Sequence, residues 1–579
     1  MDKKAILAFV LCAIIMLYFL QGFPQLTKPP DEEKKEEVVD EKTVVKEKEI
    51  LERRITVQKE QEEKIKIVQD EIDLQDNIVI QNDLIRTVWT NEGAALKSAV
   101  LTEFKNTEKT QVLELLKPNR EDLLPLRIKL LDEEFQLDRR RHKVVEQKEG
   151  KVVFTTLLEN GLRVTKDISL KNGKYHLDIA ITFENTSNSD VALAYTVNSA
   201  SGIYPEFDRY TGLASAVGID VGRGKVKLVR TATKDMPYKN ESVGISWAGA
   251  VNKYFVSILK SSSGAIIATT TSAPNENQDP LYKDDFSVNL QTKRISIIPQ
   301  GKEQHDYVLF LGPKKESILK QYDGLLVLLE YGWTTSICKI LIKILNVFYG
   351  FIPNYGIAIL LLTFLVKMIL FPLTRKSQMS MFKMQQLQPL IGKLKEKYKG
   401  DKQRMGQEQM KLFKQHGVNP MSGCMPIMLQ MPVFFALFRT LQLSFEMRQA
   451  PFVLWISDLS KPDTLIHLPF TIPFLGDGLN ILPIVMGIAS FVQMKLTPKT
   501  ISGDDAQAKM QQRMMQMMPI IFPFILYTMP SGLTLYWTTS TLISIGEQMF
   551  IRRSIKKVDI YYKGKRITKG KDKGKVKAK

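Results

Sequence analysis

The chain has 579 residues, of which 44% are hydrophobic and 25% charged, and its formal net charge is +19. Its three cysteines, Cys12, Cys338 and Cys424, lie far apart in apolar surroundings, which excludes a disulfide framework and a zinc ribbon. No Gly-rich phosphate loop, His-Glu-x-x-His or Gly-x-Ser-x-Gly motif is present. These features predict several domains, argue against an ordinary metabolic enzyme, and indicate neither a cofactor nor a metal site.

The first apolar segment lies at the N-terminus, where the charged residues 2–4 precede a run over residues 5–20 that extends to Phe23. Such a run crosses a hydrocarbon core of about 30 Å at 1.5 Å per residue. A cleaved signal peptide is the alternative, but its small-x-small cleavage site is missing. We therefore expect residues 1–27 to form an uncleaved signal anchor. Residues 28–74 mix both charge signs with almost no aromatic residues, which predicts a charged flexible linker.

Residues 75–312 have the two-residue periodicity of β-strands. Two alternating runs flank Asn172-Gly173, a pair that favours a hairpin with a type I′ turn, in which both central residues have positive φ. The alternating apolar positions are Leu162, Val164, Ile168, Leu170, Tyr175, Leu177, Ile179, Ile181 and Phe183. We expect a large antiparallel β-sandwich. Its His and acidic residues lack catalytic or metal-binding spacing, so we expect a structural or binding domain.

Residues 313–348 are expected to form a linker and an amphipathic helix. Lys339 and Lys343 lie on one face, and Trp333 and Phe348 stand near the ends. The apolar residues at helical spacing are Ile337, Ile340, Leu341, Ile344 and Leu345. This pattern is typical of a helix that lies in the membrane interface.

Residues 349–555 contain the main membrane-spanning segments. The last apolar stretch is too long for one crossing, and Met529-Pro-Ser-Gly interrupts it, so we expect it to form a hairpin of two spans. Together with the N-terminal anchor, these segments predict a multi-pass α-helical membrane protein with six spans. The expected segments after the anchor are residues 349–373, 421–445, 480–496 and the two halves of 514–551.

The charge of the connecting segments predicts their orientation. A helical hairpin at residues 375–419 carries 11 Lys and Arg against three acidic residues, and residues 552–579 carry 13 against two. The loop at residues 446–479 has two basic and four acidic residues. Because positively charged segments stay in the cytoplasm, we expect the hairpin, both termini and the basic tail at residues 556–579 to be cytoplasmic. The β-domain and the 446–479 loop then lie outside.

The hairpin combines an apolar stripe with a cationic face. Two partners fit that face: anionic lipid, at about 1 kcal/mol per basic residue near the surface, and ribosomal RNA, reached through phosphate contacts. The cationic candidates are Lys383, Lys393, Lys395, Lys397, Lys399, Lys402 and Arg404.

Lys367 is a charged residue within an apolar span. Its long side chain reaches either the interface or a wet cavity shared with Thr363, which lies one helical turn earlier. Gln430 and Gln493 on two other spans favour a shared polar hollow, because an amide in hydrocarbon needs partners. In addition, 20 of the 23 methionines lie within residues 368–549, which is typical of a surface that accepts varied apolar partners.

Ordered motifs over about residues 338–555 closely resemble the YidC family of membrane protein insertases. The N-terminal anchor and β-domain resemble its Gram-negative type, which has a large periplasmic domain. The motifs are Asn419-Pro-Met-Ser-Gly-Cys-Met-Pro, Gln430-Met-Pro, Arg448-Gln-Ala-Pro-Phe, Trp455-Ile, Asp458-Leu and Met529-Pro-Ser-Gly-Leu-Thr-Leu-Tyr-Trp.

The resemblance implies a five-helix insertase core with a hydrophilic groove, open to the cytoplasm and lipid and closed on the outer side. The position of the family's groove arginine is Lys367 here, which keeps the charge but lacks the planar guanidinium with five donors. Further groove positions of the family match Thr363, Gln430 and Gln493. The family's aromatic positions match Tyr536 and Trp537.

The resemblance further implies an insertase and chaperone of the bacterial inner membrane that is not an enzyme and that inserts and helps to fold integral membrane proteins. Its partners would be nascent membrane proteins, the Sec translocon, the ribosome and the signal-recognition receptor. A solute transporter or channel is the alternative, but it predicts repeated halves, and the sequence has none. An intramembrane protease would need a Ser/His or Asp/Asp pair, and the spans contain neither His nor Asp.

Overall fold

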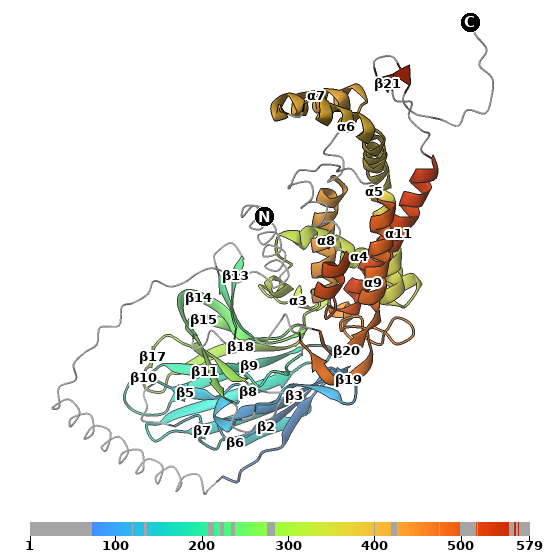
Figure 1. Cartoon of the computed structure of the whole chain (residues 1–579). Helices are drawn as coiled ribbons and strands as arrows, with labels where there is room; N and C mark the ends of the chain where they lie inside the picture. The colour runs from blue at the N-terminus through green and yellow to red at the C-terminus, as the bar shows by residue number, and fades with distance from the viewer. Residues whose placement is uncertain are drawn as a thin grey trace, which may run out of the picture. The chain divides into compact units, whose positions relative to one another are not determined.

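A computed structural model of the chain forms two compact units, with the boundary between Leu329 and Glu330 (Figure 1). The expected anchor and residues 28–71 of the linker lie outside the described residues, as does most of the basic tail. The structure describes residues 72–118, 120–131, 136–206, 214–220, 225–232, 238–274, 284–329, 331–398, 400–418, 425–473, 475–497, 517, 519–554, 561–562 and 565–566.

The first unit is built from antiparallel strands, which confirms the prediction of a β-rich domain. Among its described residues, β1 to β4 form a four-stranded sheet in sequential order, and β10 pairs with β17. The large sheet follows the path β13-β12-β14-β15-β18-β9-β8-β7-β6, with β16 on β15, β11 on β16 and β5 on β11. Short helical segments are η1 (Glu121–Leu123), α3 (Glu316–Leu319) and η3 (Leu326–Leu329).

The strands of this unit run from Ile78 to Pro313. Their bounds are β1 Ile78–Gln81, β2 Ile85–Thr90, β3 Ala95–Lys105, β4 Val112–Leu116, β5 Ile128–Leu130, β6 Lys143–Lys148, β7 Lys151–Leu157, β8 Leu162–Leu170, β9 His176–Asn185, β10 Val191–Leu193, β11 Tyr195–Ser201, β12 Ala214–Asp220, β13 Val226–Ala232, β14 Tyr238–Val251, β15 Phe255–Pro274, β16 Asp284–Gln291, β17 Ile295–Ile297 and β18 Lys302–Pro313.

Strands β8 and β9 form the hairpin that the alternating pattern predicted, but the type I′ turn is wrong. The register pairs Leu170 with Leu177, so the connection is longer than two residues, and only Gly173 of the Asn-Gly pair has positive φ. Distant side chains hold this wider turn. The amide of Asn82 donates to the carbonyls of Lys171 and Lys174, and the turn is thus decided by a tertiary contact.

A buried cation stands in the middle of β8, where the alternation points it into the core. Lys166 is 1% exposed, and its Nζ donates to the carbonyl oxygens of Gly93 at 2.7 Å, Ala94 at 3.1 Å and Leu126 at 2.7 Å. Burial, together with the nearby charge of Arg127, lowers the pKa of Lys166 to about 7. Three carbonyls from two loops therefore compensate one buried amine.

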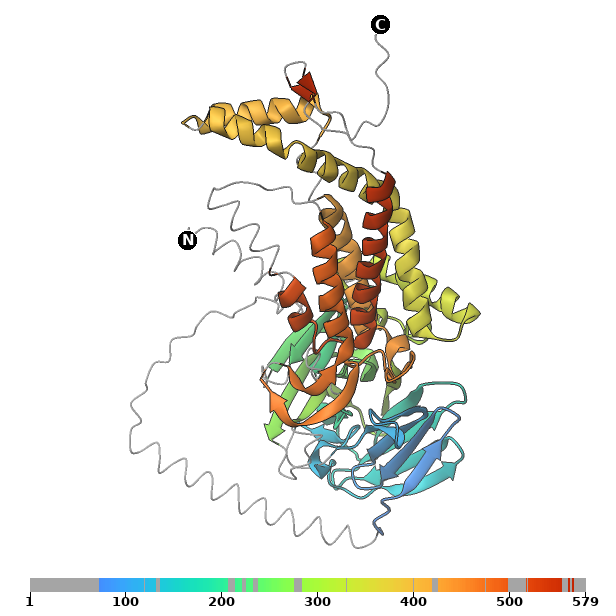
Figure 2. The same cartoon turned by 45° about the vertical axis from the view of Figure 1, so that its right-hand side comes forward.

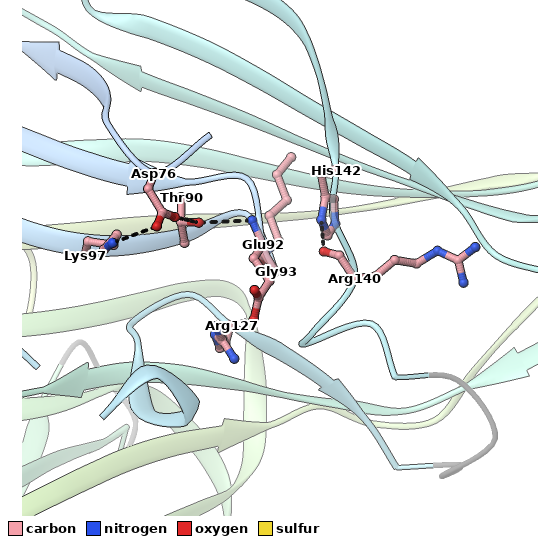
Figure 3. A network of polar contacts seen from close by, with 9 residues as sticks. Asp76, Thr90, Glu92, Gly93, Lys97, Arg127, Arg140 and His142 are labelled. Carbon is pink, nitrogen blue, oxygen red and sulfur yellow. Dashed lines mark hydrogen bonds and ion pairs between the residues drawn. The ribbon is translucent and has the colours of Figure 1, made fainter. Parts of the chain in front are cut away.

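The loop that receives Lys166 is itself held by polar contacts (Figure 3). Thr90 Oγ1 donates to Asp76 and accepts from the backbone N–H of Glu92. The Arg127 guanidinium donates to Glu92 at 3.1 Å. Gly93 has φ +65°, and a Cβ there would lie 2.4 Å from the carbonyl oxygen of Asp138, so this position needs glycine.

The second unit is helical, with a small β-hairpin at one end. In both views α5, α9 and α11 lie side by side, and the α6–α7 hairpin extends from the end of α5 (Figures 1 and 2). Its elements are η4 Gly332–Thr334, α4 Thr335–Phe351, α5 Tyr355–Gln386, α6 Gln388–Lys397, α7 Lys402–Gln415, α8 Met425–Leu443, η6 Phe445–Met447, β19 Thr464–Ile472, β20 Gly476–Asn480, α9 Ile481–Leu496, α11 Ser531–Ser554, β21 Tyr561–Tyr562 and β22 Lys565–Arg566.

The first expected span differs from the helix that forms. Residues 349–351 complete α4, and α5 begins at Tyr355, where Asn354 accepts a hydrogen bond from the N–H of Ile357 as N-cap. The helix then continues through Pro372 to Gln386. The first part of the expected hairpin is therefore an extension of α5, because helix-favouring Lys, Gln and Met residues follow the proline.

Among the described residues, α5 is the one helix both long and apolar enough to cross a membrane, and α9 is a shorter apolar helix. The six-span count thus stays a prediction. The break predicted near Pro530 coincides with a gap in the helix: residues 519–525 are helical and α11 begins at Ser531. The hairpin helices α6 and α7 pack around a common core of Met384, Leu387, Leu390, Ile391, Leu412, Phe413 and Val418.

We expect Lys166→Met to change how stability depends on pH. Lys166 takes up its proton near pH 7 in the fold and near pH 10.5 when unfolded. Between these values the unfolded chain binds more protons, so this group makes the free energy of unfolding rise with pH, by at most about 1.4 kcal/mol per pH unit. The free energy of unfolding of the wild type should therefore rise relative to that of the variant from pH 7 to 10. Thermal unfolding followed by circular dichroism measures both. The control is Lys129→Met on an exposed position of β5, and parallel pH profiles for Lys166→Met and wild type would contradict the expectation.

Candidate functional site

The candidate site lies between α5 and α11. Nζ of Lys367 donates a hydrogen bond to Oγ of Ser544 at 2.7 Å. Apolar residues beside Lys367 on α5 are exposed, with 55% of Phe364, 57% of Met368 and 68% of Ile369 accessible. The Lys367 amine therefore contacts the neighbouring helix α11, whereas these apolar side chains stay exposed.

The two helices run in the same direction, which brings these residues to one level. A Cβ on Gly532, at the start of α11, would lie 3.4 Å from Cδ1 of Ile359 near the start of α5. Lys367 and Ser544 each lie about a dozen residues after the first residue of their helix, which is about 18 Å along the helix axis. Their contact is a consequence of this parallel packing.

An acidic residue, Glu547, follows Ser544 by three positions on the same face of α11. Its carboxylate and Lys367 attract each other electrostatically. Its Oε2 is buried and has no hydrogen-bond partner among the described residues. Sequence reasoning missed Ser544 and Glu547, although Ser540, Ser544 and Glu547 have helical spacing in an apolar stretch.

The second polar contact of the site joins α8 to α11. Nε2 of Gln430 donates to Oη of Tyr536 at 2.9 Å, and Tyr536 is 2% exposed. The next residue, Trp537, stacks on Phe522 at 4.6 Å and meets Phe434 edge to face at 4.9 Å. The sequence-predicted residues Gln430, Tyr536 and Trp537 are thus brought together.

The remaining predicted groove residues, Thr363 and Gln493, make no described hydrogen bond to Lys367, Gln430 or Tyr536. Thr363 is buried on the same side of α5 as Lys367, and its hydroxyl donates to the carbonyl of Ile359. Gln493 lies on α9, and its side chain makes no hydrogen bond among the described residues, while its carbonyl accepts from Thr497. Lys367 of α5 and Gln430 of α8 thus contact α11 at two levels, through Ser544 and Tyr536, and the place of Gln493 in a groove stays a prediction.

The segment from Phe445 to Asn480 ties together the helix ends opposite the α6–α7 hairpin. Asp463 caps the start of α9, where its Oδ2 accepts from the N–H groups of Ile481 at 2.9 Å and Leu482 at 2.6 Å. Nε1 of Trp455 also donates to Asp463. Burial raises the pKa of Asp463, and the hydrogen bonds from Leu482 and Trp455 oppose this rise.

The same segment holds α11 and α5. The N–H of Gly532 donates to the carbonyl of Leu459 at 2.9 Å, and the Ser531 hydroxyl donates to the carbonyl of Asp458 at 3.0 Å. At α5, the Asn354 amide donates to the carbonyl of Phe452 at 3.0 Å. One connecting segment therefore fixes the starts of three helices.

The hairpin carries the predicted cations on both of its arms. Arg404 pairs with Asp401 at the start of α7, and the side chains of Lys399 and Lys402 lie outside the described residues. The remaining predicted cations are Lys383 at the end of α5 and Lys393, Lys395 and Lys397 on α6. Within the described parts of the chain, no three His, Cys, Asp and Glu side chains are placed to hold a metal ion.

Two family models match the chain. The model described as "60Kd inner membrane protein" matches residues 347–558, and the one described as "YidC periplasmic domain" matches residues 77–344. Two similar relatives are both named "Membrane protein insertase YidC". That of Syntrophus aciditrophicus is 33% identical over 576 residues, covering 96% of this chain and 100% of its own length. That of Geotalea daltonii is 32% identical over 494 residues, covering 83% of this chain and 87% of its own.

Similar solved structures include YidC from Thermotoga maritima, with 15% identity and a TM-score of 0.27 over 82% of this chain and 98% of that one. A galactose mutarotase-like protein from Lactobacillus casei has 11% identity and a TM-score of 0.31 over 42% of this chain and 100% of its own. Similarities at this level say nothing about function.

We expect Gly356→Ala to destabilise the helical unit. A Cβ at this position would lie 2.0 Å from Cδ2 of Phe452, so α5 and the 446–479 segment must separate, at about 1–3 kcal/mol. A matched control is Gly350→Ala in α4, where a Cβ meets nothing within 4 Å and a small stabilisation of up to about 1 kcal/mol is expected. The measurement is the thermal unfolding midpoint of the full-length protein in detergent, and equal midpoints for both variants would rule out this close packing.

Proposed function

Because the chain belongs to the YidC family of membrane protein insertases, we propose that it inserts integral membrane proteins into the bacterial inner membrane and assists their folding, alone or with the Sec translocon. The observation that carries the proposal is the 33% identity to a named insertase over 96% of the chain. Members of this family are inner membrane proteins with a periplasmic domain, and insertases are not enzymes. A solute transporter or channel is not favoured by these relatives.

Lys367 supplies the attractive charge in this proposal. A charged residue at the centre of a span costs about 2.5–3.5 kcal/mol on insertion scales. This cost favours a functional role for Lys367. The hydrogen bond from Lys367 to Ser544 supports a position inside the helical bundle over one at the lipid headgroups. An acidic or polar segment of a nascent protein is drawn toward this cation and is hydrated on its way.

A hydrophilic groove lowers the barrier for that segment by replacing hydrocarbon with polar groups part of the way across. The residues proposed for it are Lys367, Thr363, Gln430, Gln493, Tyr536 and Trp537. The contacts of Lys367 with Ser544 and of Gln430 with Tyr536 support polar partners at two levels of α11. The apolar part of the substrate meanwhile moves along exposed residues such as Phe364 and Met368 into lipid.

The orientation belongs to the same proposal. Residues 1–27 anchor the N-terminus, six spans place both termini in the cytoplasm, and residues 75–312 are periplasmic. The 446–479 segment then closes the outer end of the groove. Its hydrogen bonds to the starts of α9 and α11 support this role, because they leave the helix ends tied together on that side.

The cytoplasmic hairpin is proposed to meet the ribosome, the signal-recognition receptor and anionic lipids. Its apolar core is enclosed between α6 and α7, and its basic residues face outward, with Lys393 and Lys397 exposed. Separate partners in the membrane are the nascent substrate and the Sec translocon.

We expect the substitutions Lys367→Arg, Lys367→Ala and Lys367→Glu to separate charge from shape. In cells depleted of the wild-type protein, Arg should preserve insertion of small one- and two-span substrates with acidic outer segments. Ala should lower the insertion rate about tenfold, which corresponds to about 1.4 kcal/mol, and Glu should abolish it. If Ala supports insertion as well as Lys, charge attraction is not the mechanism. If depletion itself leaves insertion intact, the insertase function is wrong.

We expect the triple substitution of Lys393, Lys395 and Lys397 by Gln to weaken binding to anionic vesicles by about 100-fold, at about 1 kcal/mol per residue. Flotation of the full-length protein with vesicles that contain or lack phosphatidylglycerol measures this. The control is the same change at three exposed lysines of the β unit, Lys129, Lys143 and Lys225. Unchanged vesicle binding together with lost ribosome binding would assign this surface to the ribosome.

A further inference from the structure

We propose that Glu547 is an internal competitor for Lys367 that sets how acidic a substrate segment must be to enter the site. The inference rests on the proposed insertase function and deepens it. Glu547 lies outside every motif that carries the family resemblance, and it follows Ser544, the residue that accepts a hydrogen bond from Lys367, by one helical turn. Both charges stand in a part of the chain that is otherwise apolar.

Lys367 has more hydrogen-bond donors than described acceptors, which would let a substrate carboxylate bind to it. Its ammonium group has three donors, and among the described residues it makes one hydrogen bond, to Ser544. The Ser544 hydroxyl uses its own hydrogen on the carbonyl of Ser540 at 2.9 Å, so it can only accept from Lys367. Two donors of Lys367 therefore remain for a carboxylate.

Glu547 has the matching unused acceptor. Its Oε2 is buried without a hydrogen-bond partner in the described parts of the chain, although a buried, unpaired carboxylate oxygen is costly. Electrostatic attraction ties it to Lys367, but the described ion pairs do not include a direct contact between the two. The two charges thus attract each other, but neither the donors of Lys367 nor the acceptors of Glu547 are all used in described hydrogen bonds.

The next residue of α11, Gln548, contacts a different helix from Glu547. Gln548 turns to α9, where its Nε2 donates to Thr497 at 3.3 Å, whereas Glu547 interacts with Lys367 on α5. On the same face of α11, no second cation is described near Glu547: the next basic residues are Arg552 and Arg553 at the end of the helix. Lys367 is accordingly the charge that Glu547 balances.

A substrate carboxylate must then replace the attraction between Glu547 and Lys367. A segment with one acidic residue attracts Lys367 about as strongly as Glu547 does, so it gains little binding free energy. A segment with two acidic residues gains more. Removing the charge of Glu547 should leave the cation unbalanced, so that weakly acidic segments bind more tightly. Glu547 is in this sense a positioning and specificity-determining residue that acts through Lys367.

The test uses the full-length protein in proteoliposomes and a single-span substrate with a photocrosslinker in its outer segment. The segment carries two, one or no Asp residues, with Asn in the other versions. Glu547→Gln should raise the crosslinking yield of the one-Asp substrate about fivefold, the size of a partly screened charge pair, and leave the Asn substrate unchanged. Glu547→Ala, which removes the charge without adding a polar group, should act in the same direction. The matched control is Glu149→Gln in an exposed turn of the β unit.

A double-mutant cycle with Lys367→Ala separates this inference from the proposed function. In the Lys367→Ala background, Glu547→Gln should have no effect on the one-Asp substrate. An equal gain for the Asp and Asn substrates, a gain that persists without Lys367, or no gain at all would overturn the role of Glu547. Crosslinking and insertion that do not respond to Lys367→Ala would instead contradict the proposed charge attraction itself.

Discussion

The helical unit depends on the partnership of one cation with one neighbouring helix. Hydrocarbon offers no hydrogen-bond partners, so a lysine a dozen residues into an apolar helix requires polar atoms from elsewhere in the protein. Helix α11 supplies them with Ser544, which accepts from Lys367 at 2.7 Å, and with the charge of Glu547. The hydrogen bond that joins α5 to α11 is therefore also the central contact of the candidate site.

That interaction requires the two helices to be aligned along their axes, and the segment before α9 provides the alignment. It accepts hydrogen bonds from the starts of α5 and α11 through the carbonyls of Phe452 and Leu459. Two helices that begin at the same place and rise by 1.5 Å per residue reach the same level after equal numbers of residues. A connection at one end of the bundle thus determines which side chains meet in its middle.

The β unit solves a related problem with the backbone. Lys166 is fully enclosed, and carbonyls from the loops at Gly93 and Leu126 accept its hydrogen bonds. In both units a lysine occupies a position that its neighbours in sequence mark as apolar, and partners distant in sequence make the position tolerable. The Lys166 site is saturated by three acceptors and is structural, whereas Lys367 has one described acceptor, and we propose that its other donors serve a substrate.

The sequence by itself determined whatever depends on near neighbours along the chain. The alternation of β8 and β9, the apolar stripe of the α6–α7 hairpin, the break near Pro530, and Lys367 and Gln430 as polar residues of apolar segments all follow from spacing. Tertiary structure alone decided the wide turn at Gly173, the contact of Lys367 with Ser544 and the approach of Glu547 to Lys367. Periodicity tells which face of a helix or strand a residue occupies, but a hydrogen bond between helices depends on their relative rise and rotation. Contacts between residues 73 to 177 positions apart in the sequence set both.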